Sequence, residues 1–125
     1  MTATFKELYQ KFLSCTSVSI DSREVTENAM FFALRGENCD GNQYAADALE
    51  KGCAFAVIDN EKYQVNENCI LVQNVLIALQ QLSNIHRKQL QTTIIAITGT
   101  NGKTTTKEYV TRVLSKQYAV QSTVG

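Results

Sequence analysis

The sequence has little of what would tie it to a membrane or to nucleic acid. No run of apolar residues approaches the roughly 20 that a helix needs to cross a bilayer. The opening stretch, MTATFKELYQ, is amphipathic and differs from the basic and then apolar pattern of a secretory signal. Lysine plus arginine and aspartate plus glutamate number 12 each, so no overall charge attracts nucleic acid or an anionic membrane. We therefore expect a cytoplasmic protein that neither binds nucleic acid nor inserts into a membrane.

The sequence is equally poor in the patterns of a metal site. Its four cysteines include no C-x-x-C pair, and one histidine cannot complete a zinc site. An apolar content of 44% predicts a core that does not need disulfides, so we expect reduced thiols. The histidine, His86, stands beside Arg87 and Lys88 and is expected at the surface. Proline is absent, and we have no physical account of this. The cysteines are Cys15, Cys39, Cys53 and Cys69.

The first two thirds of the sequence alternate helical and β-rich patterns, which is typical of an α/β fold. Thr4 and Glu7 have the spacing of a capping box at the start of a helix. Asn42 and Asn74 are expected to cap two further helices, each followed by apolar residues at helical spacing. Short runs of apolar residues between them predict the strands of a small mixed sheet. These expected strands are 17–20, 29–34, 54–59 and 69–72.

The last third starts a new pattern after the polar run LQTT. A β-rich run at 93–98 precedes a glycine-containing loop, a predicted helix at 104–116 and a predicted strand at 118–121. That order is the first βαβ unit of a further domain. With 125 residues, the chain has room for one compact domain and part of a second. The expected domains are 1–90 and 91–125.

Phosphate chemistry is concentrated in the loop between the last predicted strand and helix. Gly99 and Gly102 let backbone N–H groups turn toward a polyphosphate. The helix N-terminus adds about half a positive charge, and Lys103 adds a full one. The hydroxyl of Thr104 suits Mg²⁺. The strict Walker pattern, G-x-x-x-x-G-K-[ST], would need a glycine where this chain has Ile97, so a strand-to-helix turn with an incidental lysine is the alternative. The predicted nucleotide-binding residues are Gly99, Thr100, Asn101, Gly102, Lys103, Thr104 and Thr105.

Two stretches resemble a known family. The string ITGTNGKTTT, residues 97–106, looks like the ATP-binding signature of the Mur ligases and their folylpolyglutamate synthetase relatives, whose shorter loop has its first glycine at Gly99. The stretch DSREVTENAMFFALRGENCDGNQYAADALEKGCAFAVI, residues 21–58, is similar to the N-terminal UDP-binding domain of the Mur ligases that act third and fourth on the UDP-muramoyl-peptide. The folate ligases lack that domain and are disfavoured.

One departure from the family pattern precedes the Phe-rich strand. The family usually has Pro-Gly there, and this chain has Glu27-Asn28. Asparagine tolerates the left-handed conformation better than most residues, so we expect the turn to survive.

The resemblance implies an ATP- and Mg²⁺-dependent ligase that adds D-alanyl-D-alanine to UDP-N-acetylmuramoyl-tripeptide through an acyl phosphate. The Lys107-Glu108 pair and the closing residues 122–125 favour this branch of the family. The alternatives are a ligase that adds a diamino acid to UDP-N-acetylmuramoyl-dipeptide, a P-loop kinase or GTPase, and a non-catalytic nucleotide-binding module. In the family the general base and the remaining metal ligands lie further along the chain, so we expect no turnover from these residues alone. We also expect a monomer.

By the same resemblance, the uridine end of the substrate contacts the loops after the first two strands. Ser22 offers a hydroxyl and Asn38 an amide for the edges of uracil. Arg23 and Arg35 suit pyrophosphate, but solvated surface positions are the expectation for both. The implied substrate-binding residues are Ile20, Ser22, Glu37, Asn38 and Cys39, Lys103 is the implied catalytic cation and Thr104 the implied metal ligand.

Overall fold

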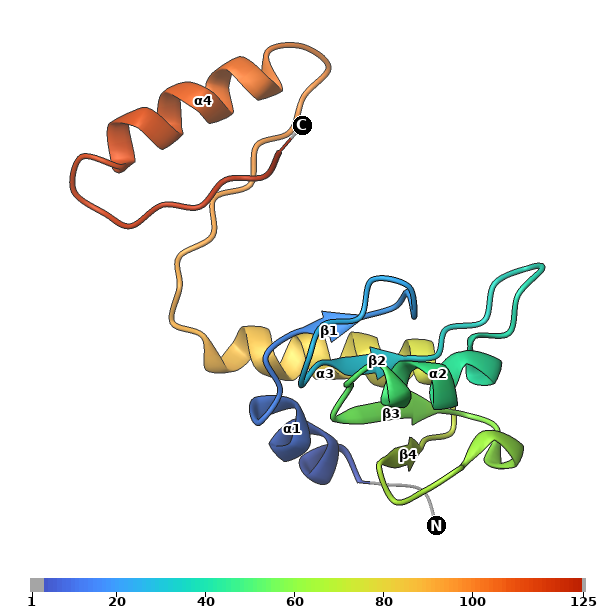
Figure 1. Ribbon diagram of the computed structural model, residues 1–125. Coiled ribbons are helices and arrows are strands. Elements are labelled where there is room, and N and C mark those ends of the chain that lie inside the picture. The colour runs from blue at the N-terminus through green and yellow to red at the C-terminus, as the bar shows by residue number, and fades with distance from the viewer. Residues whose placement is uncertain (1–3, 125) are drawn as a thin grey trace. The chain divides into compact units, whose positions relative to one another are not determined.

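The computed structural model describes residues 4–124. The chain divides after Leu90 into two compact units, which we call unit 1 and unit 2 (Figure 1). Among the described helices, none is both long and apolar enough to cross a bilayer.

A four-stranded parallel sheet forms the centre of unit 1. The strands lie in the order β1-β2-β3-β4, and every neighbouring pair is parallel. The predicted α/β class is confirmed, whereas the sheet is parallel throughout its described strands and not mixed. The physical reason is that each connection returns the chain to the edge where the preceding strand began, as parallel pairing requires. The strands are β1 (Val18–Ser19), β2 (Met30–Phe32), β3 (Phe55–Ile58) and β4 (Cys69–Leu71).

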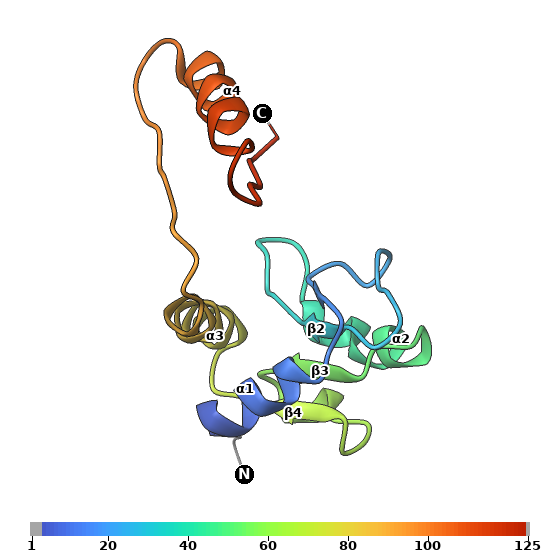
Figure 2. The same cartoon turned by 90° about the vertical axis from the view of Figure 1, so that its left-hand side faces the viewer.

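Helices cover both faces of this sheet. Helices α1 and α3 pack on one face and α2 on the other, so that Figure 2 shows β2 and β3 between α3 and α2. Two short 3₁₀ turns, η1 and η2, precede α2 and follow β3. The helical bounds are α1 (Phe5–Leu13), η1 (Gly41–Tyr44), α2 (Ala45–Glu50), η2 (Glu61–Tyr63) and α3 (Val75–Gln89).

Strand alternation sends neighbouring side chains into two different cores. Phe32 pairs with Val57, which pairs with Ile70, and this row packs against α1 and α3. Phe31 lies one position earlier and faces the opposite core, with Ala48 of α2. Because both faces are buried, β2 reads as a continuous apolar run, as buried parallel strands do.

Two of the three predicted helix caps are confirmed. The backbone N–H of Thr4 donates to the Glu7 carboxylate at 2.9 Å. The side-chain oxygen of Asn74 accepts a hydrogen bond from the Ile77 N–H at 2.9 Å, at the start of α3.

The third predicted cap is wrong. Asp40, and not Asn42, caps the helical segment, since its carboxylate accepts the N–H of Asn42 at 3.0 Å. The 3₁₀ turn begins at Gly41, which rotates Asn42 inward until none of its surface is exposed.

The turn before β2 confirms the expectation for Asn28. Its φ is 60°, the left-handed conformation. Its N–H donates to the Gly52 carbonyl at 2.8 Å, and its side-chain amide donates to the Ser14 carbonyl at 3.0 Å. Asn28 therefore holds the turn in the left-handed conformation, as predicted.

His86 differs from its expected surface position. Its Nδ1 lies 3.4 Å from the Tyr9 hydroxyl, and its ring packs edge-on against Phe12 with centroids 5.0 Å apart. The residue is half-buried where α1 meets α3, because its position on α3 faces the aromatic side of α1.

Among the described residues of unit 2, one regular element forms, helix α4 (Lys103–Leu114), which confirms the predicted helix. The two strands expected at 93–98 and 118–121 are not formed in the described residues, and Figure 1 draws both segments as extended chain without arrows. A strand needs a hydrogen-bonded neighbour, and the apolar residues Ile94 and Ile95 are instead more than half exposed.

Candidate functional site

The carboxyl ends of all four strands meet at one edge of the sheet, because the strands are parallel. The turn after β1 carries Ser22, and the loop after β2 carries residues 36–39, which we call the 36–39 loop. Asp59 directly follows β3. Ligands of open α/β sheets bind outside this edge, so unit 1 presents its loops where such a site is expected.

Ser22 is held with its backbone fixed and its hydroxyl available. The residue is 8% exposed. Its carbonyl accepts a hydrogen bond from the Lys51 ammonium at 3.0 Å, and Lys51 also contacts the Asp47 carboxylate at 2.8 Å. Within the described part of the chain the Ser22 hydroxyl makes no hydrogen bond. It is therefore suited to bind a ligand.

The neighbouring Asp21 and Arg23 bind each other. Arg23 donates from Nε at 2.9 Å and from Nη2 at 2.6 Å to the two carboxylate oxygens of Asp21. These hydrogen bonds, with one from the Arg23 backbone N–H, lower the pKa of Asp21 to about 2. The Arg23 side chain is 84% exposed, as expected.

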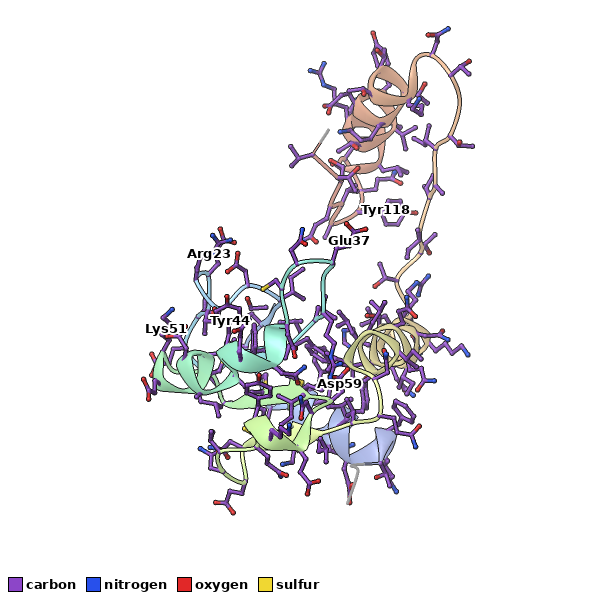
Figure 3. The ribbon with its side chains drawn as sticks, turned by 90° about the vertical axis from the view of Figure 1, so that its right-hand side faces the viewer. Arg23, Glu37, Tyr44, Lys51, Asp59 and Tyr118 are labelled. Carbon is purple, nitrogen blue, oxygen red and sulfur yellow. The ribbon has the colours of Figure 1, made fainter. Side chains whose placement is uncertain are left out.

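The 36–39 loop projects from the sheet, with Glu37 at its outer end (Figure 3). The Gly36 N–H donates to the Cys39 carbonyl at 2.8 Å and closes the turn. The Cys39 thiol lies 3.8 Å from the Tyr44 hydroxyl. Glu37, Asn38 and Cys39 are exposed, as is Ile20 after β1.

The predicted substrate-binding residues thus share one edge of the sheet without direct bonding. Among the described residues, no hydrogen bond or ion pair joins the Ser22 turn to the 36–39 loop. The structure brings them to the same side of unit 1, with the Glu37 and Asn38 side chains exposed and the nearly buried Ser22 hydroxyl without a hydrogen bond to any described residue. All four cysteines are free thiols, and burial raises the pKa of the Cys53 thiol.

The base of the loop contains a polar cluster that the sequence did not predict. Asn42 donates to Asp40 at 2.6 Å and to Asp59 at 2.9 Å. Arg35, expected as a solvated side chain, is instead ion-paired with Asp59 at 2.8 Å. An acidic residue directly after a buried strand was the available signal, but its partners lie 17 and 24 positions away.

Unit 2 carries the predicted phosphate-binding loop at the start of α4. Gly102 is the residue before the helix and has a φ of 74°, which a side chain would strain. The first hydrogen bond of the helix runs from the Thr106 N–H to the Gly102 carbonyl at 2.9 Å. The N–H groups of residues 103–105 therefore have no intrahelical acceptor. The Lys103 ammonium donates to the Gly99 carbonyl.

Both units match known sequence families. Residues 14–90 match the family described as "Mur ligase family, catalytic domain", and residues 97–125 match "Mur ligase middle domain". The chain belongs to the Mur ligase family.

Curated relatives fall in two branches of the Mur ligase family. The UDP-N-acetylmuramoyl-tripeptide–D-alanyl-D-alanine ligase of Bacillus subtilis is 40% identical over 86% of this chain and 24% of its own length. The UDP-N-acetylmuramoyl-L-alanyl-D-glutamate–2,6-diaminopimelate ligase of Rickettsia conorii is 35% identical over 100% of this chain and 26% of its own length. The chain therefore spans about a quarter of the length of these relatives.

Solved Mur ligase structures are similar in fold. The MurF ligase from Thermotoga maritima in complex with ADP superposes with a TM-score of 0.75 and 27% identity, over 91% of this chain and 26% of that one. MurF from Acinetobacter baumannii gives a TM-score of 0.68 and 28% identity, over 94% of this chain and 28% of that one.

The start of α4 in unit 2 presents groups of the kind that bind anions. An added Cβ at Gly102 would meet no atom within 4 Å, so the space beside the helix N-terminus is open. The N–H groups of residues 103–105 lie at this helix N-terminus, and the Lys103 ammonium contacts the Gly99 carbonyl of the same loop. No group of three or more His, Cys, Asp or Glu side chains that could hold a metal occurs in the described residues. The exposed Thr104 hydroxyl is suited to one position around Mg²⁺.

Proposed function

We propose that this chain provides two ligand-binding parts of an ATP-dependent ligase that joins D-alanyl-D-alanine to UDP-N-acetylmuramoyl-tripeptide. Residues 1–90 bind the uridine end of the UDP-linked substrate, and residues 91–125 begin the ATP-binding domain. The observation that carries the proposal is the start of α4, where left-handed Gly102, three unpaired N–H groups and Lys103 occur together. The alternative, a strand-to-helix turn with an incidental lysine, gives no reason for these three features to occur at the same place.

In unit 1, substrate binding is assigned to the edge formed by the loops after β1 and β2. The Ser22 hydroxyl has no partner among the described residues, and Lys51 fixes the backbone beside it. The amide of Asn38 is exposed in the 36–39 loop. A hydroxyl and an amide on separate loops suit the donor and acceptor edges of uracil. Ile20 and Glu37 complete the proposed contact surface.

In unit 2, the chain's own groups neutralise and orient phosphate. The N–H groups at the start of α4 and the Lys103 ammonium belong to the same loop and helix end, and both favour negative charge there. Thr104 would hold Mg²⁺ through its hydroxyl. Bound ATP would supply the phosphoryl group that activates the substrate carboxylate. We propose that Lys103 is the catalytic cation of this step.

The second candidate is the ligase that adds a diamino acid to UDP-N-acetylmuramoyl-dipeptide. It is favoured by the Rickettsia conorii relative, whose similarity extends over 100% of this chain. The D-alanyl-D-alanine branch is preferred because the Bacillus subtilis relative has the higher identity, 40% against 35%, and because the two solved structures named above are MurF ligases.

The test is a ligation assay with the protein in its full natural length, ATP and Mg²⁺. One arm offers UDP-N-acetylmuramoyl-tripeptide with D-alanyl-D-alanine, and the other UDP-N-acetylmuramoyl-dipeptide with diaminopimelate. Phosphate release and product mass are followed in both. Turnover in the first arm is expected, turnover in the second alone would establish the alternative, and ATP hydrolysis without ligation would refute both.

Variants of the loop then test the role of unit 2. Lys103→Ala should lower turnover about a hundredfold or more, because one preorganised charge contact at a phosphoryl group is lost. Lys116→Ala is the matched control, since this lysine lies beyond the end of α4. Thr104→Ser keeps the hydroxyl and should be mild, whereas Thr104→Ala should weaken Mg²⁺ affinity, so that more Mg²⁺ is needed for half-maximal turnover. An unchanged rate in Lys103→Ala would contradict the assignment.

A further inference from the structure

The 36–39 loop is closed at its base and open at its tip. Arg35 and Asp40 face each other in an antiparallel bridge, and the Gly41 N–H donates to the Leu34 carbonyl at 3.0 Å. At the outer end, Glu37 and Asn38 are exposed. The position of the tip therefore depends on how firmly the base is attached to the rest of unit 1.

Asp59 attaches the first side of the base. Its carboxylate accepts Arg35 Nε at 3.0 Å, and Arg35 Nη2 lies 2.8 Å from the same oxygen. Its other oxygen accepts the Val75 N–H at 3.2 Å, at the start of α3. The Asp59 side chain is only 8% exposed, so water competes little for these contacts. The loop is thereby joined to β3 and to α3 through one carboxylate.

Asn42 attaches the second side. Its side-chain oxygen accepts the Asp59 N–H at 3.0 Å, and its amide donates to both Asp59 and Asp40. The residue is completely buried. Its side chain cannot turn without breaking these bonds, and an unpaired polar group in such a place is costly. Both ends of the loop are therefore fixed to Asp59.

We propose that Asp59, Arg35 and Asn42 are positioning residues for ligand binding by the 36–39 loop. This inference rests on the proposed function, in which that loop binds the uridine end of the substrate. A loop that is held in its binding position before the ligand arrives binds more tightly, because the competent population is larger. None of the three needs to touch the ligand to have this effect.

Arg35 is the residue to vary, because 52% of its side chain is exposed and its loss leaves no buried cavity. Arg35→Met removes the ion pair and keeps an apolar stem, and Arg35→Lys restores a charge without the planar fork. Arg87→Met is the matched control, since Arg87 is an exposed arginine on α3 whose hydrogen bond goes to Leu90.

The experiment titrates each variant of this chain with UDP and follows the amide resonances of Ser22 and Asn38. Arg35→Met should bind UDP about tenfold more weakly, as a tenfold smaller competent population requires. The UDP affinity of Arg35→Lys should lie between those of Arg35→Met and the wild type, and Arg87→Met should bind UDP as tightly as the wild type. Arg35→Met should unfold at a lower temperature than Arg87→Met, because it leaves the nearly buried Asp59 carboxylate without its cation, so the titrations are made well below both unfolding midpoints. In the ligand-free Arg35→Met protein, hydrogen exchange at the Gly36 amide should be faster.

Each outcome separates this inference from the proposed function. UDP binding by the wild type with unchanged affinity in Arg35→Met overturns the positioning role alone. Slow hydrogen exchange at Gly36 in Arg35→Met also overturns it, because the loop would then be held by other contacts. No UDP binding by the wild type overturns the proposed ligand of unit 1 and this inference with it.

Discussion

Replacement of Asn42 by alanine should destabilise unit 1 by about 2 to 4 kcal/mol. The side chain is completely buried. Its loss leaves the Asp59 N–H without its acceptor, which costs about 1 to 3 kcal/mol, and the missing side-chain volume adds about 1 kcal/mol. Loss of the hydrogen bonds from the Asn42 amide to the two carboxylates costs less. Asp40 is 37% exposed and can bind water in place of the amide, and Asp59 keeps its ion pair with Arg35.

The assay is urea unfolding of the whole chain, followed through the amide resonances of Phe31 and Val57 in the middle of the sheet. These residues are buried and report the folding of unit 1. The control is Asn66→Ala, because Asn66 accepts a similar hydrogen bond, from the Asn68 N–H at 2.9 Å, in an exposed turn. Water replaces that bond, so the change should stay within about 0.5 kcal/mol.

A result that would refute the reasoning is a loss in Asn42→Ala no larger than that in Asn66→Ala. It would mean that water reaches the Asp59 N–H in the variant, and that the polar cluster contributes little to the stability of the loop base. A change in the slope of the unfolding curve would instead indicate an altered unfolded state.

Two further predictions concern the same edge of the sheet. Gly41→Ala should cost about 3 kcal/mol in urea unfolding, because an added Cβ would lie 2.4 Å from the Leu34 carbonyl oxygen and the backbone would have to shift; an unchanged midpoint would contradict the close approach. Asp21 should titrate at about 2 in the folded protein, below its ordinary value of 3.8, when its side-chain carbon resonance is followed against pH. Because the folded pKa is the lower one, its contribution to stability is complete above about pH 4 and is lost as the pH falls toward 2. Arg23→Met should raise the pKa of Asp21 toward its ordinary value. An unchanged pKa would show that the ion pair with Arg23 does not lower it.

The elements of unit 1 could be predicted because their signals are local. The buried run around Phe31, the cap at Asn74 and the left-handed tolerance of Asn28 each depend on a few adjacent residues. The same holds for the loop at Gly102, whose conformation and helix follow from its own sequence.

The rest depends on partners that are distant in sequence. Aspartate and asparagine can both cap a helix. The sequence alone could not show which of Asp40 and Asn42 is the cap, because the choice depends on the hydrogen bond between Asn42 and Asp59. His86 was placed at the surface because the charges beside it are visible in the sequence, whereas its contact with Phe12 of α1 is not. The segments at 93–98 and 118–121 have strand composition, but composition cannot supply the neighbouring strand.

The order of the strands in the sheet has a consequence for how unit 1 folds. Every strand pairs with the strand before or after it in the chain, as Val18 does with Met30 and Ala56 with Cys69. No pairing in the described sheet must wait for a segment made much later. Because each strand pairs with its neighbour in sequence, each crossover is the shortest that this strand order allows, and β2, β3 and β4 can be added to the sheet in turn. Helix α3 then covers the face that α1 also covers, so unit 1 completes its sheet and its core without any residue of the phosphate-binding loop.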